Sequence, residues 1–204
     1  MAQTPRSRTA TGAARREALL DAALVCFEAK GLVRTGIEDI REEAGASPSS
    51  VYHLFGGLPD IIGALLERTF VRRFESVTAR VVRTRTARTA VIALVEAHLD
   101  WVIEHPTEAR FMYRALALDL DGGRIEELFA TKEELKRALN EHLERVGVLS
   151  PGTPPAMVDV VVLGVTHQAC RVWLTAPEVL DPAWMRRTLP GLAWRTVRPE
   201  AAPR

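Results

Sequence analysis

The chain has 204 residues, of which 47% are hydrophobic and 26% are charged, and its formal net charge is +1. Such a chain is long enough for one large globular domain or two small ones. The nearly balanced charge excludes a uniformly basic nucleic-acid coat, so any contact with DNA must come from a local surface.

The start of the chain carries an excess of basic charge. Residues 1–16 contain no acidic residue but four arginines: Arg6, Arg8, Arg15 and Arg16. This stretch shows no apolar periodicity, and we expect residues 1–15 to form a flexible basic arm. Such an arm can be a solvated tail or can contact the phosphates of DNA, and the sequence leaves both open.

Helical periodicity dominates the chain and β-type alternation is scarce, so we predict an all-α fold. We expect an N-terminal three-helix helix-turn-helix domain over residues 16–60, a larger helical-bundle domain over 61–198, and a short tail at 199–204. The helices themselves are expected at about 13–30, 37–44, 48–55, 58–84, 87–104, 107–119, 124–146, 155–175 and 182–196.

Capping residues mark the ends of the first three predicted helices. Gly31 lies where a left-handed C-cap would end the first one. Thr35 and Glu38 have the spacing of a capping box at the start of the second. Ser47 can cap the third, which has Pro48 at its first position, where the missing N–H costs nothing. Two short helices joined by a tight turn are typical of a helix-turn-helix.

The third predicted helix has one apolar side. Val51 and Phe55, four residues apart, are expected to pack inward. The outward positions hold Ser49, Ser50, Tyr52 and His53. Small hydroxyl groups and an aromatic ring with a polar tip suit close contact with phosphates and base edges.

The stretch from Arg16 to about Leu66 resembles the DNA-binding domain of the TetR family of bacterial regulators. The matching residues are Leu20, Ala22, Ala23, Phe27, Gly31, Thr35, Gly36, Asp39, Ile40, Ala44, Gly45, Ser47, Ser50, Val51, Tyr52, Phe55, Asp60, Ile61 and Ile62. They span about a quarter of the chain. Any one of them alone would be a weak signal, and their joint spacing is a strong one.

The resemblance implies binding to double-stranded DNA at a near-palindromic operator. Thr35 and Gly36 would hold a phosphate through a hydroxyl and backbone N–H groups. Ser49 and His53 fall at variable outward positions and are candidates for reading bases. The start of the fourth helix, at Gly57, would add an anion site through its dipole. The remaining predicted DNA-binding residues, at the start and on the outward side of the third helix, are Ser47, Pro48, Ser50 and Tyr52.

Three residues depart from the family pattern. Arg41 stands where a small residue usually packs against the recognition helix, so we expect its stem to lie along the protein and its charged end to reach solvent. Leu54 replaces a frequent histidine. Leu58 replaces a frequent lysine that contacts phosphate, which puts that contact in doubt.

The second domain is expected to bind a small hydrophobic ligand. His98 is the one polar member of an apolar stripe in residues 87–104, and it can be either a satisfied core residue or a group that orients a ligand. We predict a pocket drawn from Phe70, Phe74, His98, Trp101, Phe111, Met112, Tyr113, His167, Cys170 and Trp173. Most of these are expected to be core, and a subset to line the cavity.

The segment 156–175 is apolar on nearly all sides, so a partner subunit is the natural cover for its outer face. The predicted dimer interface consists of Val158, Val161, Val165, Val172, Trp184, Leu189 and Leu192. The resemblance points the same way, because family members form dimers through their last two long helices. A monomer remains the alternative. Pro190 is expected to kink or end the last helix.

Other functional classes find little support. The five histidines show no metal-ligand spacing, and motifs for nucleotide binding or a serine nucleophile are missing, so we expect neither an enzyme nor a cofactor or metal. Cys26 and Cys170 lie outside any CxxC spacing. No apolar run approaches ~18 residues, which favours a cytoplasmic protein without membrane contact. The main functional alternative is a helical protein-interaction adaptor with a non-functional DNA-binding head.

Overall fold

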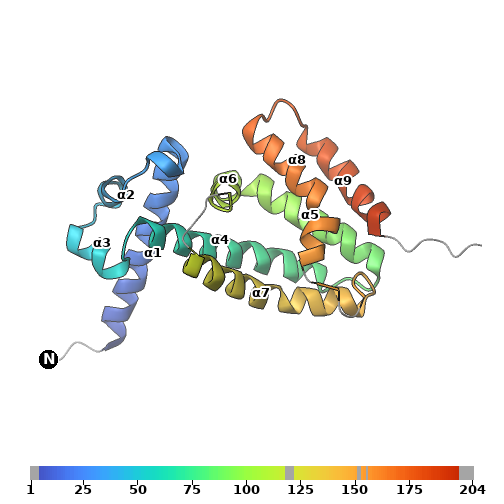
Figure 1. The fold of residues 1–204 in the computed structure, drawn as a ribbon, viewed down its shortest axis with the longest axis horizontal. Coiled ribbons are helices and arrows are strands. Elements are labelled where there is room, and N and C mark those ends of the chain that lie inside the picture. Colours follow the sequence, from blue (N-terminus) through green and yellow to red (C-terminus); the bar gives the residue numbers. More distant parts are fainter. Residues whose placement is uncertain (1–4, 118–121, 151–152, 155, 198–204) are drawn as a thin grey trace, which may run out of the picture. The chain divides into compact units, whose positions relative to one another are not determined.

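The computed structural model describes residues 5–117, 122–150, 153–154 and 156–197, with side chains described outside 5–11 and 122–133. No strand occurs in this part of the chain, which confirms the all-α prediction. The elements are α1 (Pro5–Lys30), the 3-10 turn η1 (Leu32–Arg34), α2 (Ile37–Glu43), α3 (Pro48–Leu54), α4 (Leu58–Val81), α5 (Ala87–Glu104), α6 (Pro106–Ala115), α7 (Gly122–Arg145), the π-helical turn η2 (Val158–Val162), α8 (Gly164–Thr175) and α9 (Pro182–Val197) (Figure 1).

The chain forms two compact units. The head unit comprises residues 1–69 and 107–128, and the body unit comprises residues 70–106 and 129–204. The boundary predicted at residue 60 therefore falls inside α4, and α6 is grouped with the head. The reason is aromatic packing, because the ring of Phe111 on α6 stacks on Phe27 of α1 with centroids 5.6 Å apart.

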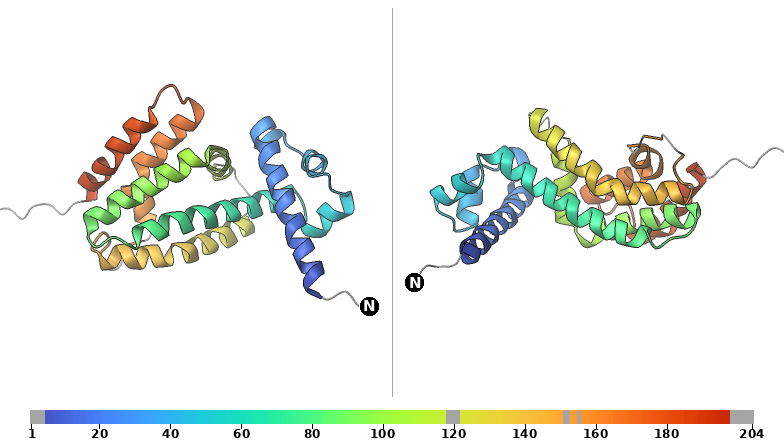
Figure 2. Two further views of the ribbon diagram at one scale, coloured as in Figure 1. Left: turned by 180° about the vertical axis from the view of Figure 1, so that it is seen from behind. Right: turned by 90° about the horizontal axis from the view of Figure 1, so that it is seen from below.

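The core of the head unit forms along one side of α1. Leu19, Leu20, Ala23 and Phe27 are buried there, and the steps of three and four residues from the two leucines to Ala23 and on to Phe27 place them on one side of the helix. Helices α2 and α3 lie on the same side of α1 (Figures 1 and 2). They contribute Ile40 and Val51 to the core, both with almost no exposed surface. These short helices are held by this burial rather than by their length.

Helix α1 is longer than predicted. It begins at Pro5, so residues 5–15 are helical and the flexible arm expected over residues 1–15 is wrong for this part. Nothing in this stretch stops a helix, because its single glycine is Gly12 and its only proline stands at the first helical position.

Two glycines end the first two helices. Gly31 has φ +83° and Gly45 has φ +59°, values that favour glycine because it has no Cβ. The predicted capping box of Thr35 and Glu38 is wrong. Helix α2 begins one residue later, after Gly36, whose N–H donates to Oδ2 of Asp39 at 2.7 Å.

The body unit contains α5, α8, α9 and parts of α4 and α7. Helix α9 packs along α5, and α8 lies against both (Figure 2). Asp100 on α5 accepts from Arg80 of α4 at 2.6 Å and from Arg186 of α9 at 2.9 Å. Burial alone would raise the pKa of Asp100, but these two arginines outweigh it and the pKa is lowered. The carboxylate thus joins three helices while it stays charged.

Two details near the C-terminus differ from the prediction. The single helix expected over 155–175 is divided into the π turn η2 and helix α8, and in the π turn Leu163 N donates to Val158 O at 3.1 Å. Pro190 does not end α9, which continues to Val197. Its ring is buried. None of the described helices is long and apolar enough to cross a membrane.

Candidate nucleic-acid interface

Helix α3 has the local structure that its sequence predicts. The hydroxyl of Ser47 accepts from the backbone N–H of Ser50 at 3.2 Å, and Pro48 occupies the first turn. This cap fixes where the helix starts. Val51 and Phe55 are buried, which confirms the inward side of the helix.

The opposite side of α3 is polar and open to solvent. Ser49 and His53 are exposed, and Tyr52 has 57% of its surface exposed. Ser50 is half-buried. The hydroxyls of Ser47 and Ser49 lie 3.1 Å apart and share a hydrogen bond. A capped helix with this pattern can offer hydroxyl, phenol and imidazole groups to a large partner without disturbing the core.

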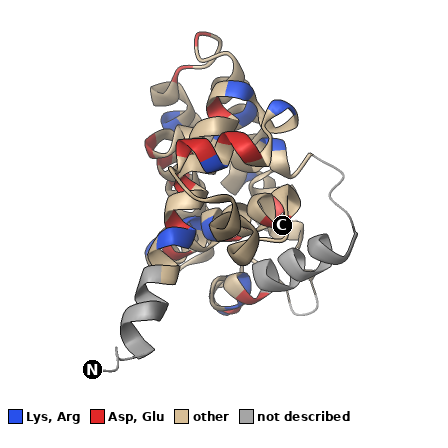
Figure 3. Cartoon of the chain, turned by 90° about the vertical axis from the view of Figure 1, so that its left-hand side faces the viewer, with Lys and Arg blue, Asp and Glu red and all other residues tan. Residues whose placement is uncertain are grey.

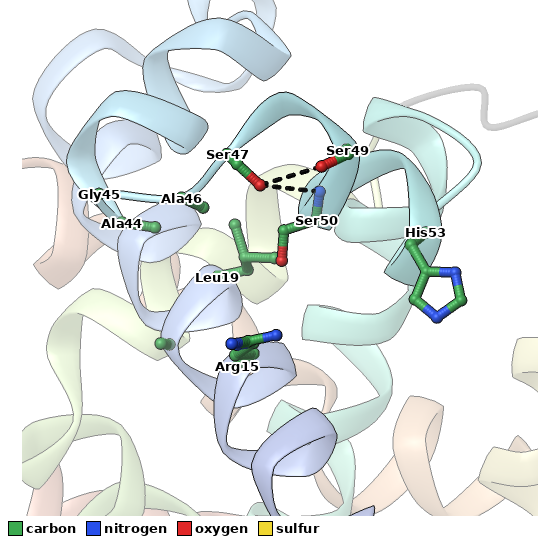
Figure 4. A pocket seen from close by; sticks show the side chains of 10 residues that line it. Arg15, Leu19, Ala44, Gly45, Ala46, Ser47, Ser49, Ser50 and His53 are labelled. Carbon is green, nitrogen blue, oxygen red and sulfur yellow. Dashed lines mark hydrogen bonds between the residues drawn. The ribbon is translucent and has the colours of Figure 1, made fainter. Parts of the chain in front are cut away.

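An open hollow of about 620 Å³ lies beside α3. Figure 4 shows its lining, with Arg15 and Leu19 contributed by α1 and with Ser50 and His53 by α3. Arg15 is exposed and stands one helical turn before the buried Leu19. The continuous helix therefore holds a cation beside the polar side of α3. Arg15 lies where the predicted arm and the first predicted helix overlap, and its four-residue spacing from Leu19 is the sequence signal that favours the helix.

The structure contradicts the predicted role of the Thr35 hydroxyl. Thr35 is buried, and its Oγ1 donates to the carbonyl oxygens of Gly31 at 2.8 Å and Cys26 at 3.2 Å. The hydroxyl thus joins the end of α1 to the start of α2. The phosphate contact was what the family resemblance implied for Thr35, whereas here the hydroxyl is used within the protein.

The predicted phosphate contact at Gly36 is also not supported. Its N–H donates to the carboxylate of Asp39, which lies in the first turn of α2. Lys30 donates to the same carboxylate at 2.6 Å, and this hydrogen bond, followed by that from Gly36, lowers the pKa of Asp39. An ionised carboxylate thus already occupies the helix start where an anion would bind.

The start of α4 resembles that of α2. Asp60 lies in its first turn and accepts from the N–H of Gly56 at 2.7 Å. The anion site predicted at Gly57 therefore already has a negative charge beside it. The sequence shows this carboxylate three residues after Gly57. An acidic residue in the first turn stabilises the helix by interacting with its dipole.

Charge further limits which side of the head can meet DNA. Helix α2 carries the acidic residues Glu38, Asp39, Glu42 and Glu43; charged residues are coloured by sign in Figure 3. Arg41 donates to Glu38 at 2.6 Å and to the carbonyl of Ala46 at 3.4 Å. As expected, its stem is partly covered while its end reaches these surface groups. The acidic side of α2 would repel phosphates, so α3 and Arg15 are the better surface.

The predicted ligand residues divide between the two units. Phe111, Met112 and Tyr113 are grouped with the head unit, where the first two are buried. In the body, Phe70 and Trp101 are buried, and Trp173 is half-buried. One small cavity in this unit has a volume of about 10 Å³, room for about one water molecule, and of the predicted ligand residues Phe74 is the one that lines it.

His98 is a satisfied core residue, the first of the two alternatives for it. It is fully buried, and its Nδ1 accepts from Nε of Arg73 at 3.1 Å. Since an arginine can only donate, the proton of His98 must lie on Nε2, which faces Sγ of Cys170 at 3.9 Å. The ring of His167 stands edge-on at 4.6 Å. Burial, Arg73 and His167, in that order, lower the pKa of His98 well below 6.5.

The predicted dimer residues differ in exposure. Val165 on α8 and Trp184 on α9 are exposed, with 63% and 42% of their surface open. Val161, Val172 and Leu192 are half-buried. Val158 and Leu189 are buried within the body unit, so the prediction that they face a partner is wrong. Val160, which the sequence analysis missed, is 67% exposed. The π turn changes the register of this segment, which a regular helical pattern could not show.

Part of the chain is similar in sequence to known proteins. Residues 19–65 match the family model for bacterial regulatory proteins of the tetR family. The chain is 31% identical over 86 residues to the HTH-type transcriptional regulator BetI of Brucella anthropi. That match covers 42% of this chain and 44% of BetI, so the chain spans less than half of this curated relative.

Solved structures share the fold over nearly the whole chain. The transcriptional regulator FadR from Bacillus subtilis, in complex with stearoyl-CoA, has a TM-score of 0.70 at 15% identity and covers 89% of this chain and 99% of its own. A TetR family transcription regulator from Marinobacter aquaeolei VT8 has a TM-score of 0.71 at 15% identity, with 94% and 98% covered. At these identities the likeness establishes the fold.

Proposed function

We propose that this chain, a member of the tetR family of bacterial regulatory proteins, is a sequence-specific DNA-binding transcriptional regulator. The observation that carries the proposal is helix α3. Its Ser47 cap and buried Val51 fix the helix, while Ser49, Tyr52 and His53 remain exposed. A rigid helix with an exposed polar side is what reading bases in a major groove requires.

The DNA contacts would divide into two kinds. Ser49 and His53 would meet base edges, and Tyr52 and Arg15 would contact phosphates beside them. Thr35, Gly36 and Gly57 are left out, because their polar groups are bonded within the protein or lie beside a carboxylate. The proposed interface is thus smaller than the sequence predicted and is centred on α3.

The active form would be a homodimer. One short helix reads only a few base pairs, and two copies related by a two-fold axis would read a near-palindrome with half-sites about 34–36 Å apart. The exposed apolar side chains on α8 and α9, Val165 and Trp184, support an interface there. Val165→Glu should therefore produce monomers in sedimentation, whereas Val82→Glu, at an exposed valine outside these two helices, should not.

Regulation would come from a small ligand bound in the body unit, which releases the repressor from its operator. A ligand can shift DNA affinity only by binding one conformation better than another. FadR, a transcriptional regulator with the same fold, was solved in complex with stearoyl-CoA, which supports a ligand-binding role for a protein of this fold. If the ligand releases the repressor, adding ligand should lower the affinity of the protein for its operator. If adding ligand instead raised this affinity, the protein would be an activator or a repressor that the ligand recruits to DNA.

DNA binding is tested by selecting sequences from a random pool and measuring their affinity over a salt series. Arg15→Gln should weaken binding and lower the slope of log affinity against log salt by about one. Arg83→Gln, at an exposed arginine of the body unit, is the matched control and should leave the slope unchanged. No enrichment of any sequence at low salt would refute the proposed function.

A further inference from the structure

The body unit encloses a small cavity whose lining is part apolar and part charged. Phe74, Leu94 and Leu163 form apolar walls from α4, α5 and the end of the π turn η2. Arg73, Lys136 and Asp159 line the same space. At about 10 Å³ the cavity holds no more than one water molecule, so an organic ligand would have to displace part of its wall.

Arg73 is the unusual member of this lining. It is 4% exposed, yet it pairs with no acidic residue in the described part of the chain. Its contacts are with neutral groups, namely Nδ1 of His98 at 3.1 Å and the ring of Phe74, whose centre lies 4.9 Å from the guanidinium carbon. A buried cation is costly unless a negative charge accompanies it.

Neighbouring charges do not neutralise Arg73. Lys136 is also buried, and its Nζ lies 5.9 Å from the centre of the same Phe74 ring. Asp159 pairs with Lys136. Two cations and one carboxylate line the cavity, so its charge is 2 − 1 = +1. His98 adds no charge, because its Nδ1 accepts a hydrogen bond from Arg73 and therefore carries no proton, which leaves the ring neutral.

The wall that contains Asp159 has an irregular backbone. Val158–Val162 form the π turn. Such turns are rare in proteins, and those that occur are often found at functional sites. Within it Leu163 N donates to Val158 O in place of the usual α-helical bond, and both residues line the cavity. Returning this segment to α-helical hydrogen bonding would shift both side chains, so this wall can move without loss of a helix.

We propose that this cavity is the ligand site of the body unit and that it takes a monocarboxylic acid with an apolar chain. The carboxylate would sit between the guanidinium of Arg73 and Lys136, and the chain would displace the side chains of the π turn and pack on Phe74. This proposal rests on the proposed regulator function and makes one part of it more specific, since the sequence predicted only a small hydrophobic ligand and the cavity adds an anionic end to it.

The test is calorimetric titration of the full chain with octanoate and with octanamide. The two probes have the same chain, and only the first carries a negative charge. Octanoate should bind the wild type roughly 10- to 100-fold more tightly than octanamide, the ratio expected for a charge-assisted bidentate hydrogen bond. Equal affinities of the two probes, or no binding of either, would overturn the proposal.

Substitution locates the site. Arg73→Gln should bring octanoate down to the affinity of octanamide, whereas Arg83→Gln, which removes the same charge at an exposed position, should bind as the wild type does. Arg73→Lys, which keeps the charge, serves as a second variant if Arg73→Gln fails to fold, and it should retain part of the preference. Octanoate binding that is unchanged in Arg73→Gln would place the acid elsewhere and refute this site.

Operator binding separates the two proposals. If the wild type binds a selected DNA sequence but no octanoate, the ligand assignment fails and the regulator function stands. If it binds octanoate through Arg73 but no DNA sequence, the cavity assignment stands and the regulator function fails. If both hold, octanoate should lower operator affinity in the wild type and have no effect in Arg73→Gln.

Discussion

The head and body units place their polar side chains in opposite ways. In the head, Tyr52 and His53 are exposed on a helix whose other side is buried. In the body, Arg73 and His98 are buried among apolar residues. An exposed polar surface can meet a partner as large as DNA, whereas a buried cation can meet only a molecule that enters the protein. The position of polar groups relative to the core thus separates two kinds of site.

The largest expected effect contrasts the two sides of α3. Val51→Asp should lower the free energy of unfolding by about 3 kcal/mol or more, because Val51 is 1% exposed and an unpaired carboxylate would be buried. Chemical denaturation measures this change. Ser49→Asp, on the exposed side, should change stability by less than about 0.5 kcal/mol yet abolish operator binding by repelling phosphate. A stable Val51→Asp protein would contradict the assigned orientation of α3.

A second prediction concerns the buried charges of the body. Lys136→Met should cost about 2 kcal/mol of stability, because it leaves the partly buried carboxylate of Asp159 without its cation. Adding Asp159→Leu should restore much of the loss, and a double-mutant cycle gives the coupling between the two residues. Additive effects would mean that the pair contributes little and that Asp159 is solvated without Lys136.

The head was largely predictable because its signals are local. Gly31, Ser47 and Pro48 mark helix ends within a few residues of where the structure has them. Errors arose where a local pattern had two meanings. Thr35 precedes a helix, which suits a phosphate contact, but its hydroxyl bonds to the carbonyls of α1. The sequence alone does not show whether a polar group at a helix start serves the helix or a ligand.

The body was predictable only as a set of helices. The pairing of Arg73 with His98 joins residues 25 apart, and that of Lys136 with Asp159 joins residues 23 apart. No periodic pattern connects such positions. We expected aromatic residues to mark the pocket, yet Phe111 packs on α1 in the head. The charged residues that line the cavity were missed because charges are ordinarily expected at the surface.

The third prediction is a pH dependence specific to the body. The pKa of His98 is lowered in the folded protein, so the unfolded chain binds its proton at higher pH. Stability from this group is therefore complete above pH 6.5 and declines as pH falls toward the folded-state pKa, by at most about 1.4 kcal/mol per pH unit. Thermal unfolding from neutral to mildly acidic pH measures the decline. His98→Gln should flatten it, and His53→Gln, at an exposed position, should not.

The smallest effect tests whether the head depends on its cap. Ser47→Ala removes the hydroxyl that accepts from Ser50 N–H, and it should cost about 1 kcal/mol. Ser49→Ala is the control, because its hydroxyl contacts that of Ser47 but caps no N–H, and it should cost less than about 0.5 kcal/mol. Denaturant unfolding distinguishes the two values.

The same pair of variants separates folding from recognition. Because α3 must be ordered before it can enter a groove, Ser47→Ala should weaken binding to every DNA sequence by a similar factor. Ser49→Ala should instead alter which base is preferred at one position of the operator while leaving stability unchanged. If Ser49→Ala lowered stability more than Ser47→Ala, Ser47 would not be the residue that caps α3. The helix would then be stabilised by contacts other than those at its first turn.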